Sequence, residues 1–300
     1  MFRLLSGLLF LSLAACSAPE TTGDLHYMPS ELISSEVTWE GRVVVDRIVI
    51  VGRSGTLRIA PGTKILFEKV DWDGDGIGDA EITVEGKLIA DGTPQEPILM
   101  ASAEVDPSPG DWKYLHINFA RGARLSNVRI SDAFSGIQVH YSKVEIDRCD
   151  FRHNIDGIRF STADLTVKGS LSMQNRHGIR FEERGHPALI SGNRVTDNEV
   201  GIFAVTECKG TSTFKDNDFS ANETPVKMGW EQHSDIDLTG NWWGAPADKV
   251  KESILDGKRD STLGVAVIAP VMGLAPDISE PFYLPYKDPD WERATKRDLR

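Results

Sequence analysis

The hydrophobic pattern after residue 39 alternates with a period of two, and glycines interrupt it at short intervals. The alternating apolar positions in its first part are Val43, Val45, Ile48, Ile50, Leu57, Ile59, Ile65 and Phe67. This alternation is typical of short β-strands that bury one face. Nothing in this part keeps the spacing of three to four residues that marks an amphipathic helix. The pattern therefore predicts an all-β protein.

A repeat unit recurs in phase through the middle of the chain. Gly-Ile stands at 136–137, 157–158, 178–179 and 201–202, and Pro-Val takes the next place at 225–226. The intervals are 21, 21, 23 and 24 residues. Leucine-rich repeats have a similar period but need a leucine spacing that is absent here, and propeller blades need about 40–50 residues. Coils of a parallel β-helix fit, because each coil stacks about 4.8 Å above the last.

The repeat also assigns roles to its residues. Four of the five units carry an asparagine three positions before the Gly or Pro, and we expect these amides to bond to backbone in a bend and to stack as a ladder. They are Asn154, Asn175, Asn198 and Asn222. The apolar residue that follows each Gly or Pro should stack inward, forming a continuous core. These residues are Ile137, Ile158, Ile179, Ile202 and Val226.

With these repeats, the chain resembles secreted right-handed parallel β-helix proteins of the pectate-lyase-like and NosD-like kind. Segments 57–67 and 84–98 look like that family's opening coils, and Gly-Asn-Trp-Trp-Gly at 240–244 looks like its last coil and cap. The resemblance covers about residues 40–276. It implies a single-stranded right-handed parallel β-helix, a solenoid, over 40–245. We expect a small C-terminal cap over 246–276, including a short helix, and an extended tail over 277–300.

The N-terminal segment predicts export and a lipid anchor. A positive residue is followed by the mostly apolar stretch 4–15, which is too short to span a membrane but suits a signal peptide. The stretch ends in Leu-Ala-Ala-Cys16, which resembles a bacterial lipobox and implies cleavage after residue 15 and diacylglycerol on Cys16. We expect residues 16–39 to form a polar tether. Ser17 favours the outer membrane in a Gram-negative host, so the protein should be extracytoplasmic and anchored to the cell envelope.

The net charge limits the classes of partner, and the positions of the cysteines argue against a disulfide. The chain has 33 Lys and Arg against 45 Asp and Glu, a formal net charge of −12. Nucleic-acid binding is therefore not expected, because phosphates must be met by clustered cations. Cys149 and Cys208 fall on different parts of the coil and two coils apart, which is beyond the span of a disulfide. We expect both thiols to be buried and unpaired.

One acidic segment matches a calcium-binding loop of the EF-hand type. Its carboxylates stand at loop positions 1, 3, 5 and 9, and its glycine stands at position 6. The match lacks the usual carboxylate at position 12, so the carboxylate one residue earlier or one from another coil would have to substitute. We expect an insertion at 71–82 that binds calcium weakly. The predicted ligands are Asp71, Asp73, Asp75, Ile77 through its carbonyl, Asp79 and Glu81.

A catalytic site is less well supported. Polysaccharide lyases, hydrolases and epimerases share the β-helix fold, but the catalytic motifs of polygalacturonases and alginate epimerases are absent apart from a fragment at 154–157. The repeat explains that fragment as a turn, so we assign no catalytic residue. We interpret the histidines as surface or turn residues, since they lack metal-ligand spacing. They are His116, His140, His153, His177, His186 and His233.

A binding face is the better functional candidate. Two residues after each Gly or Pro of the repeat stand Gln138, Arg159, Arg180, Phe203 and Lys227, and Tyr141 and Trp230 lie three residues beyond the first and last of them. Stacked coils would place these side chains in a partly basic row that suits a polysaccharide. We expect a non-catalytic protein that presents a rigid face to a glycan or an envelope protein. Alternatives are a divergent polysaccharide lyase, epimerase or hydrolase, or a NosD-like accessory protein in metal-centre maturation.

Overall fold

The computed structural model describes residues 25–28 and 32–279, and nearly all of its regular structure is β-strand. Its strands form three long parallel sheets, here called A, B and C. Sheet A contains β1 (Leu25–Met28), β4 (Arg42–Val45), β7 (Lys64–Phe67), β10 (Ile98–Ser102), β13 (Val128–Ser131), β16 (Asp150–Arg152), β19 (Leu171–Met173) and β22 (Arg194–Thr196).

Sheets B and C complete each coil. Sheet B contains β2 (Leu32–Ile33), β5 (Ile48–Val51), β8 (Glu81–Val84), β11 (Trp112–Asn118), β14 (Ala133–His140), β17 (Asp156–Ser161), β20 (His177–Glu182), β23 (Val200–Thr206) and β25 (Thr224–Glu231). Sheet C contains β3 (Glu36–Trp39), β6 (Thr56–Ile59), β9 (Lys87–Asp91), β12 (Gly122–Ser126), β15 (Lys143–Asp147), β18 (Asp164–Lys168), β21 (Leu189–Ser191) and β24 (Thr213–Lys215).

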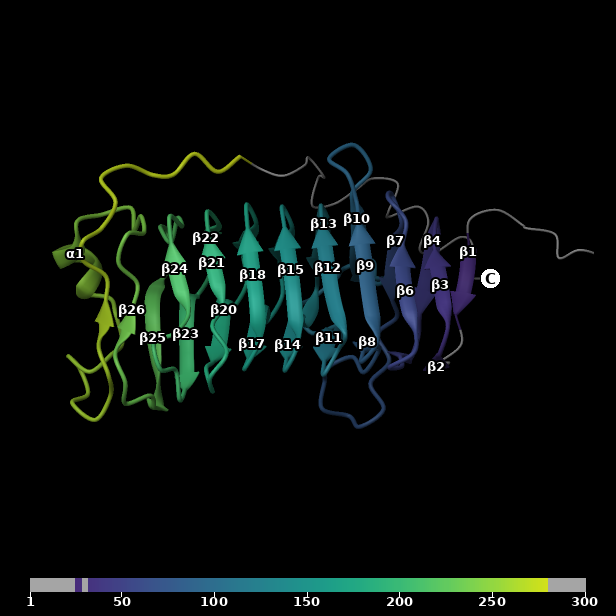
Figure 1. The fold of residues 1–300 in the computed structure, drawn as a ribbon, viewed down its shortest axis with the longest axis horizontal. Coiled ribbons are helices and arrows are strands. Elements are labelled where there is room, and N and C mark those ends of the chain that lie inside the picture. Colours follow the sequence, from purple (N-terminus) through teal and green to yellow (C-terminus); the bar gives the residue numbers. More distant parts are fainter. Residues whose placement is uncertain (1–24, 29–31, 280–300) are drawn as a thin grey trace, which may run out of the picture.

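The chain visits sheets A, B and C in turn, and each strand pairs in parallel with the strand one coil away. Figure 1 shows the coils side by side along the long axis, with β1 at one end and α1 at the other. This arrangement is a parallel β-helix, so the predicted fold class is confirmed. In the described part of the chain, no helix is long and apolar enough to cross a membrane.

The predicted core column is present. Ile137 pairs with Ile158, Ile158 with Ile179, and the column continues through Ile202 to Val226. All five side chains are buried. The glycine before each isoleucine is required by stacking, since a Cβ on Gly136 would lie 2.7 Å from the Gly157 carbonyl oxygen of the next coil.

Two asparagine ladders line the bends between sheets. In the predicted ladder, the Asn175 Oδ1 accepts the Asn154 backbone N–H at 2.9 Å, and the Asn198 Oδ1 accepts that of Asn175 at 3.0 Å. A second ladder runs along the bend before sheet A, where Asn193, Asn217 and Asn241 repeat the same bond. These amides satisfy backbone groups that the bends remove from the sheets.

The far end of the solenoid is covered by residues 232–279. Here α1 (Ala247–Lys251) and a small sheet of β26 (Ile236–Asp237) and β27 (Ala266–Val267) follow the last coil. Trp243 is buried, and its ring lies 5.1 Å from that of Phe219 between centroids. The end of the apolar core is therefore shielded from water, as a solenoid requires.

The structure corrects two predicted boundaries. Residues 25–28 and 32–39 do not belong to a tether, because β1, β2 and β3 pair with β4, β5 and β6 and so belong to the first coil. Their alternation was missed because β2 and β3 are only two and four residues long. The acidic insertion also ends earlier than predicted, since residues 81 and 82 already lie in β8. The predicted signal peptide and Cys16 lie outside the described residues, as does most of the predicted tail.

The cysteine prediction is confirmed. Within the described residues, Cys149 and Cys208 are both buried and form no disulfide. Burial raises the pKa of the Cys149 thiol to about 12 and raises that of Cys208 as well. Both side chains therefore act as small apolar residues of the interior rather than as reactive thiols.

Candidate functional site

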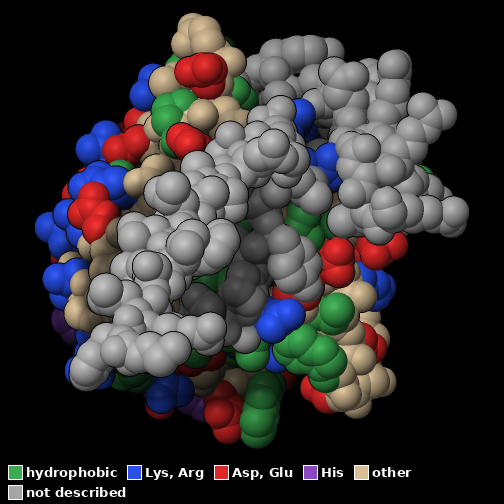
Figure 2. Space-filling view, turned by 90° about the vertical axis from the view of Figure 1, so that its right-hand side faces the viewer, with side chains coloured by type: hydrophobic (Ala, Val, Ile, Leu, Met, Phe, Trp, Pro, Cys, Tyr) green, Lys and Arg blue, Asp and Glu red, His purple; other side chains and the backbone are tan. Residues whose placement is uncertain are grey.

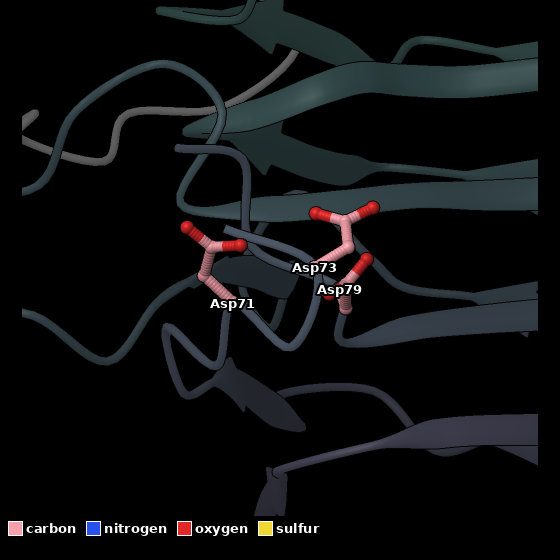
Figure 3. A group of neighbouring side chains, drawn as sticks. All are labelled: Asp71, Asp73 and Asp79. Atoms are coloured by element: carbon pink, nitrogen blue, oxygen red, sulfur yellow. The ribbon is translucent and has the colours of Figure 1, made fainter. Parts of the chain in front are cut away.

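The acidic loop lies between β7 and β8, at the corner where sheet A passes to sheet B. Asp71, Asp73 and Asp79 each present a carboxylate oxygen, and these oxygens lie within 4.8 Å of one another. Figure 3 shows the three side chains on the same loop. Calcium bonds to oxygen at about 2.3–2.6 Å, so ligands on opposite sides of one ion are up to about 5 Å apart. The spacing of these oxygens fits such an ion.

The loop's own hydrogen bonds hold these carboxylates in place. Asp71 accepts the N–H groups of Gly74 and Gly76, and both glycines have positive φ, at 76° and 88°. Asp79 accepts the Trp72 N–H at 2.8 Å, and the Lys113 ammonium lies 3.1 Å from its other oxygen. The Trp72 bond, followed by the Lys113 contact, holds the pKa of Asp79 below its usual range despite desolvation.

The other predicted ligands lie outside this group of three. Asp75 is exposed and accepts the Ile77 N–H at 2.8 Å. Glu81 is buried in β8 and accepts the Thr83 hydroxyl at 2.7 Å. Burial raises the pKa of Glu81. The structure therefore does not bring Glu81 into the position of the missing twelfth ligand.

The predicted row of side chains lies on the outer face of sheet B, with its members in register from strand to strand. It extends one strand further than the repeat indicates, since His116 pairs with Gln138. We call the following set the sheet B row: His116, Gln138, Arg159, Arg180, Phe203 and Lys227. Gln138 is buried and the others are partly buried, so their positions are constrained by neighbours.

A buried carboxylate organises the middle of this row. Asp156 is fully buried, and its carboxylate lies 2.7 Å from His177 Nδ1 and 3.3 Å from Arg180 Nη1. Arg159 Nη1 lies 4.0 Å from the same group. Burial, together with the nearby Arg180 charge, lowers the pKa of Arg159. The two guanidiniums are thus held side by side above one negative charge.

His116 and His140 form a neutral, hydrogen-bonding part of the same face. Burial lowers the pKa of His116 to about 4, aided by the nearby His140 ring and by the positive charge of Arg159. Burial also lowers the pKa of His140, whose Nε2 lies 3.2 Å from the Gln138 amide nitrogen. Neutral imidazoles both donate and accept, so this part can bond to hydroxyl groups.

Aromatic rings accompany the row. Tyr141 stacks on Phe119, with ring centroids 4.6 Å apart and planes 9° from parallel, and both rings are exposed. Phe203 lies between two cations, 5.6 Å from the Arg180 guanidinium carbon and 5.1 Å from the Lys227 ammonium. Trp230, at the end of β25, is 82% exposed. Phe119 was missed because the insertions at 68–80 and 103–111 break the period that locates its neighbours.

The histidine interpretation was wrong for His177, which is buried in β20. His116 and His140 lie on β11 and β14 and are partly buried on the outer face of sheet B. For His116 and His140 the signal was in the sequence, since both stand at outward positions of the period-two pattern. His177 stands two residues before the inward Ile179, so the pattern gives no such signal for it. The others fit the prediction: His153 lies at a turn with φ 57°, and His186 and His233 are exposed.

Comparison with known families agrees with the architecture. Residues 114–242 match the family model of the right-handed beta helix region. No curated protein and no solved structure matches the chain. Together with the three parallel sheets, the match shows that this chain has the right-handed parallel β-helix fold.

Proposed function

We propose that this protein is an envelope-anchored binding protein that holds an acidic glycan along the outer face of sheet B. The observation that carries the proposal is the in-register sheet B row. Arg159 and Arg180 occupy adjacent coils, about 4.8 Å apart along the solenoid, and Lys227 lies two coils beyond Arg180. A linear chain with regularly spaced carboxylates or sulfates would meet a series of cations.

The uncharged members of the face would recognise the sugar itself. The partly exposed neutral imidazole of His140, held by the Gln138 amide, can bond to hydroxyl groups. The exposed Phe119–Tyr141 pair and Phe203 offer apolar surface to the C–H faces of sugar rings. A face that combines these groups suits a glycan better than a protein partner, whose interface would need a larger apolar centre.

A glycan array probed with the purified protein tests this proposal. We expect binding to acidic polysaccharides, weakened by Arg159→Ala and by Arg180→Ala. Arg124→Ala is a matched control, because Arg124 is a 62% exposed arginine of sheet C that pairs with Asp91. Equal binding by all three variants, or no binding to any glycan, would contradict the proposal.

A specific observation favours a second candidate, catalysis on a polysaccharide. His177 is oriented by the buried Asp156 at 2.7 Å, an arrangement that fixes a histidine tautomer and allows its other nitrogen to take a proton. Mass spectrometry of glycans incubated with the protein distinguishes the candidates. New products that disappear in His177→Ala would establish catalysis, and unchanged glycans would favour binding alone.

We also propose that the acidic loop binds calcium, which would neutralise three converging carboxylates and stabilise the corner beside sheet B. Titration calorimetry with calcium on the whole protein tests it. The double variant Asp71→Asn with Asp73→Asn should lose binding. Asp75→Asn is the matched control, since Asp75 is an exposed carboxylate of the same loop outside the group. Loss of binding in the control alone, or no heat with the parent protein, would refute this ligand set.

The lipid anchor remains a proposal that rests on the lipobox resemblance. Metabolic labelling with a palmitate analogue tests it directly. We expect incorporation into the parent protein and none into Cys16→Ser, because the thiol is the group that receives the diacylglycerol. Equal incorporation into both would exclude Cys16.

A further inference from the structure

Exposed apolar side chains gather in one groove at the N-terminal end of the solenoid. The groove is lined by Leu32, Asp46, Arg47, Ile48, Ile50, Val70 and Trp72. Leu32 is 63% exposed and Trp72 59%, while Ile48 and Ile50 are each more than a third exposed. Isolated exposed apolar residues are ordinary, but a contiguous group of this kind marks an interaction surface.

Sheet B and the acidic loop build this surface. Leu32 of β2 pairs in register with Ile50 of β5, so both side chains lie on the outer face of sheet B. Trp72 comes from the acidic loop and closes the groove from the side. Its backbone N–H is bonded to Asp79, which fixes the loop where the indole projects. Figure 2 looks at this end of the molecule and shows hydrophobic side chains along its lower rim.

The position of the groove determines what it can meet. Strand β1 begins at Leu25, nine residues after Cys16, and β1 pairs with β4 in the second coil. Nine extended residues span at most about 32 Å. A lipid on Cys16 would therefore keep this end of the solenoid, and not the distant cap, close to the bilayer surface.

We propose that this groove, with Trp72 at its edge, docks on the lipid bilayer surface and orients the solenoid on the membrane. The proposal rests on the lipid anchor proposed above. Trp side chains favour the interface between lipid and water, where the ring is in apolar surroundings and the N–H remains wet. The short tether raises the local concentration of lipid at the groove, so a weak contact suffices.

Charge sets a condition on this contact. Asp71 and Asp73 flank Trp72, and Asp46 lies in the groove, paired with Arg47 at 2.8 Å. These carboxylates would repel anionic headgroups at close range. Neutral vesicles of phosphatidylcholine and phosphatidylethanolamine in equal amounts therefore isolate the apolar contact.

A lipid-sensitive probe tests the docking. Ile50→Cys places one accessible thiol in the groove, since Cys149 and Cys208 are buried. The full lipoprotein carries the NBD fluorophore on this thiol and is reconstituted into the neutral vesicles. Trp230→Cys is the control, because Trp230 is an exposed residue on the last strand of the same sheet. The parent chain is labelled in parallel and reports whether the Cys16 thiol carries the lipid, since a free thiol there would take the dye.

The expected result is a shift of the groove probe to shorter wavelength and its quenching by doxyl-labelled lipids, with neither effect at residue 230. Trp72→Ala should reduce both effects. If the groove probe has the same emission and quenching as the control, and the parent chain takes no dye, the docking surface is overturned and the anchor stands. A probe shielded from aqueous iodide but not quenched by doxyl lipids indicates another occupant and overturns the proposal. Dye on Cys16 of the parent overturns the anchor and the docking together.

Discussion

Replacing one central asparagine of the first ladder should destabilise the fold far more than replacing the last one. Asn175 is buried, and its Oδ1 is the acceptor of the Asn154 backbone N–H at 2.9 Å. Its amide nitrogen also bonds to the Phe151 carbonyl at 3.1 Å and the Asn198 Oδ1 at 3.1 Å. Asn175→Ala leaves a buried N–H without its acceptor, which costs about 1–3 kcal/mol, and loses the amide's other bonds at about 1 kcal/mol each.

The sum predicts a loss of about 3–5 kcal/mol in the free energy of unfolding. Asn222 makes the same bond to the Asn198 N–H, at 3.0 Å, but it is half-buried at the end of the ladder. Water can reach the groups that Asn222→Ala exposes, so we expect a loss of about 1 kcal/mol there. The comparison separates ladder bonding from the general cost of removing an asparagine from a turn.

Urea unfolding followed by circular dichroism measures both variants, and amide hydrogen exchange reports on the Asn154 N–H itself. We expect a lower urea midpoint for Asn175→Ala and faster exchange at Asn154. Because solenoid coils can unfold in steps, the exchange measurement is needed beside the midpoint. Equal midpoints for the two variants, with unchanged exchange at Asn154, would refute the assignment of stability to the ladder.

Three further predictions concern ionisable groups. Burial opposes ionisation of Glu183, but bonds from the backbone at Ser212, Thr211 and Lys209 hold its pKa below 4.5. Its stabilising contribution should be present above pH 4.5 and disappear as the pH falls through the folded-state pKa, and Glu183→Gln should remove this dependence from acid unfolding curves. His116 has a pKa of about 4 in the folded protein against 6.5 when unfolded, so it should stay neutral down to about pH 5 in an NMR titration. The free energy of unfolding should fall as the pH drops below 6.5, because the unfolded chain then binds the proton more readily. Lys113→Gln should raise calcium affinity several-fold in calorimetry, because the ammonium competes for Asp79 at 3.1 Å; an unchanged affinity would exclude that competition.

The repeat made the later coils predictable because each bend is encoded locally. Gly157 must be glycine, since a Cβ there would lie 2.9 Å from the Gly178 carbonyl oxygen, and Asn175 must supply an amide to the same bend. Such requirements recur once per coil and therefore appear in the sequence as a period. The core column and the sheet B row both follow from that period, because residues with the same offset share a face.

The earlier coils lack this signal, and the missed residues lie there. Residues 68–80 and 103–111 are inserted between strands, so the distance in sequence from one coil to the next no longer gives the register. His116 could not be aligned with Gln138 for this reason, nor could Phe119 be stacked on Tyr141. Asp79 and Lys113, which form an ion pair across two coils, are hidden in the same way.

The two insertions share a location that bears on function. Both lie where sheet A passes to sheet B, a corner that β16 and β17 cross with only residues 153–155. Neither is needed to close a coil. The two insertions are nevertheless joined by a hydrogen bond from the Gly78 N–H to the Gly110 carbonyl and by an ion pair between Lys69 and Asp111 at 3.0 Å. The fold does not require these two insertions, yet both are ordered beside one face. Binding residues concentrate in such loops on a rigid scaffold. We therefore infer that the acidic loop, with Trp72, and the sheet B row form one binding side of the solenoid, which sheets A and C would hold rigid.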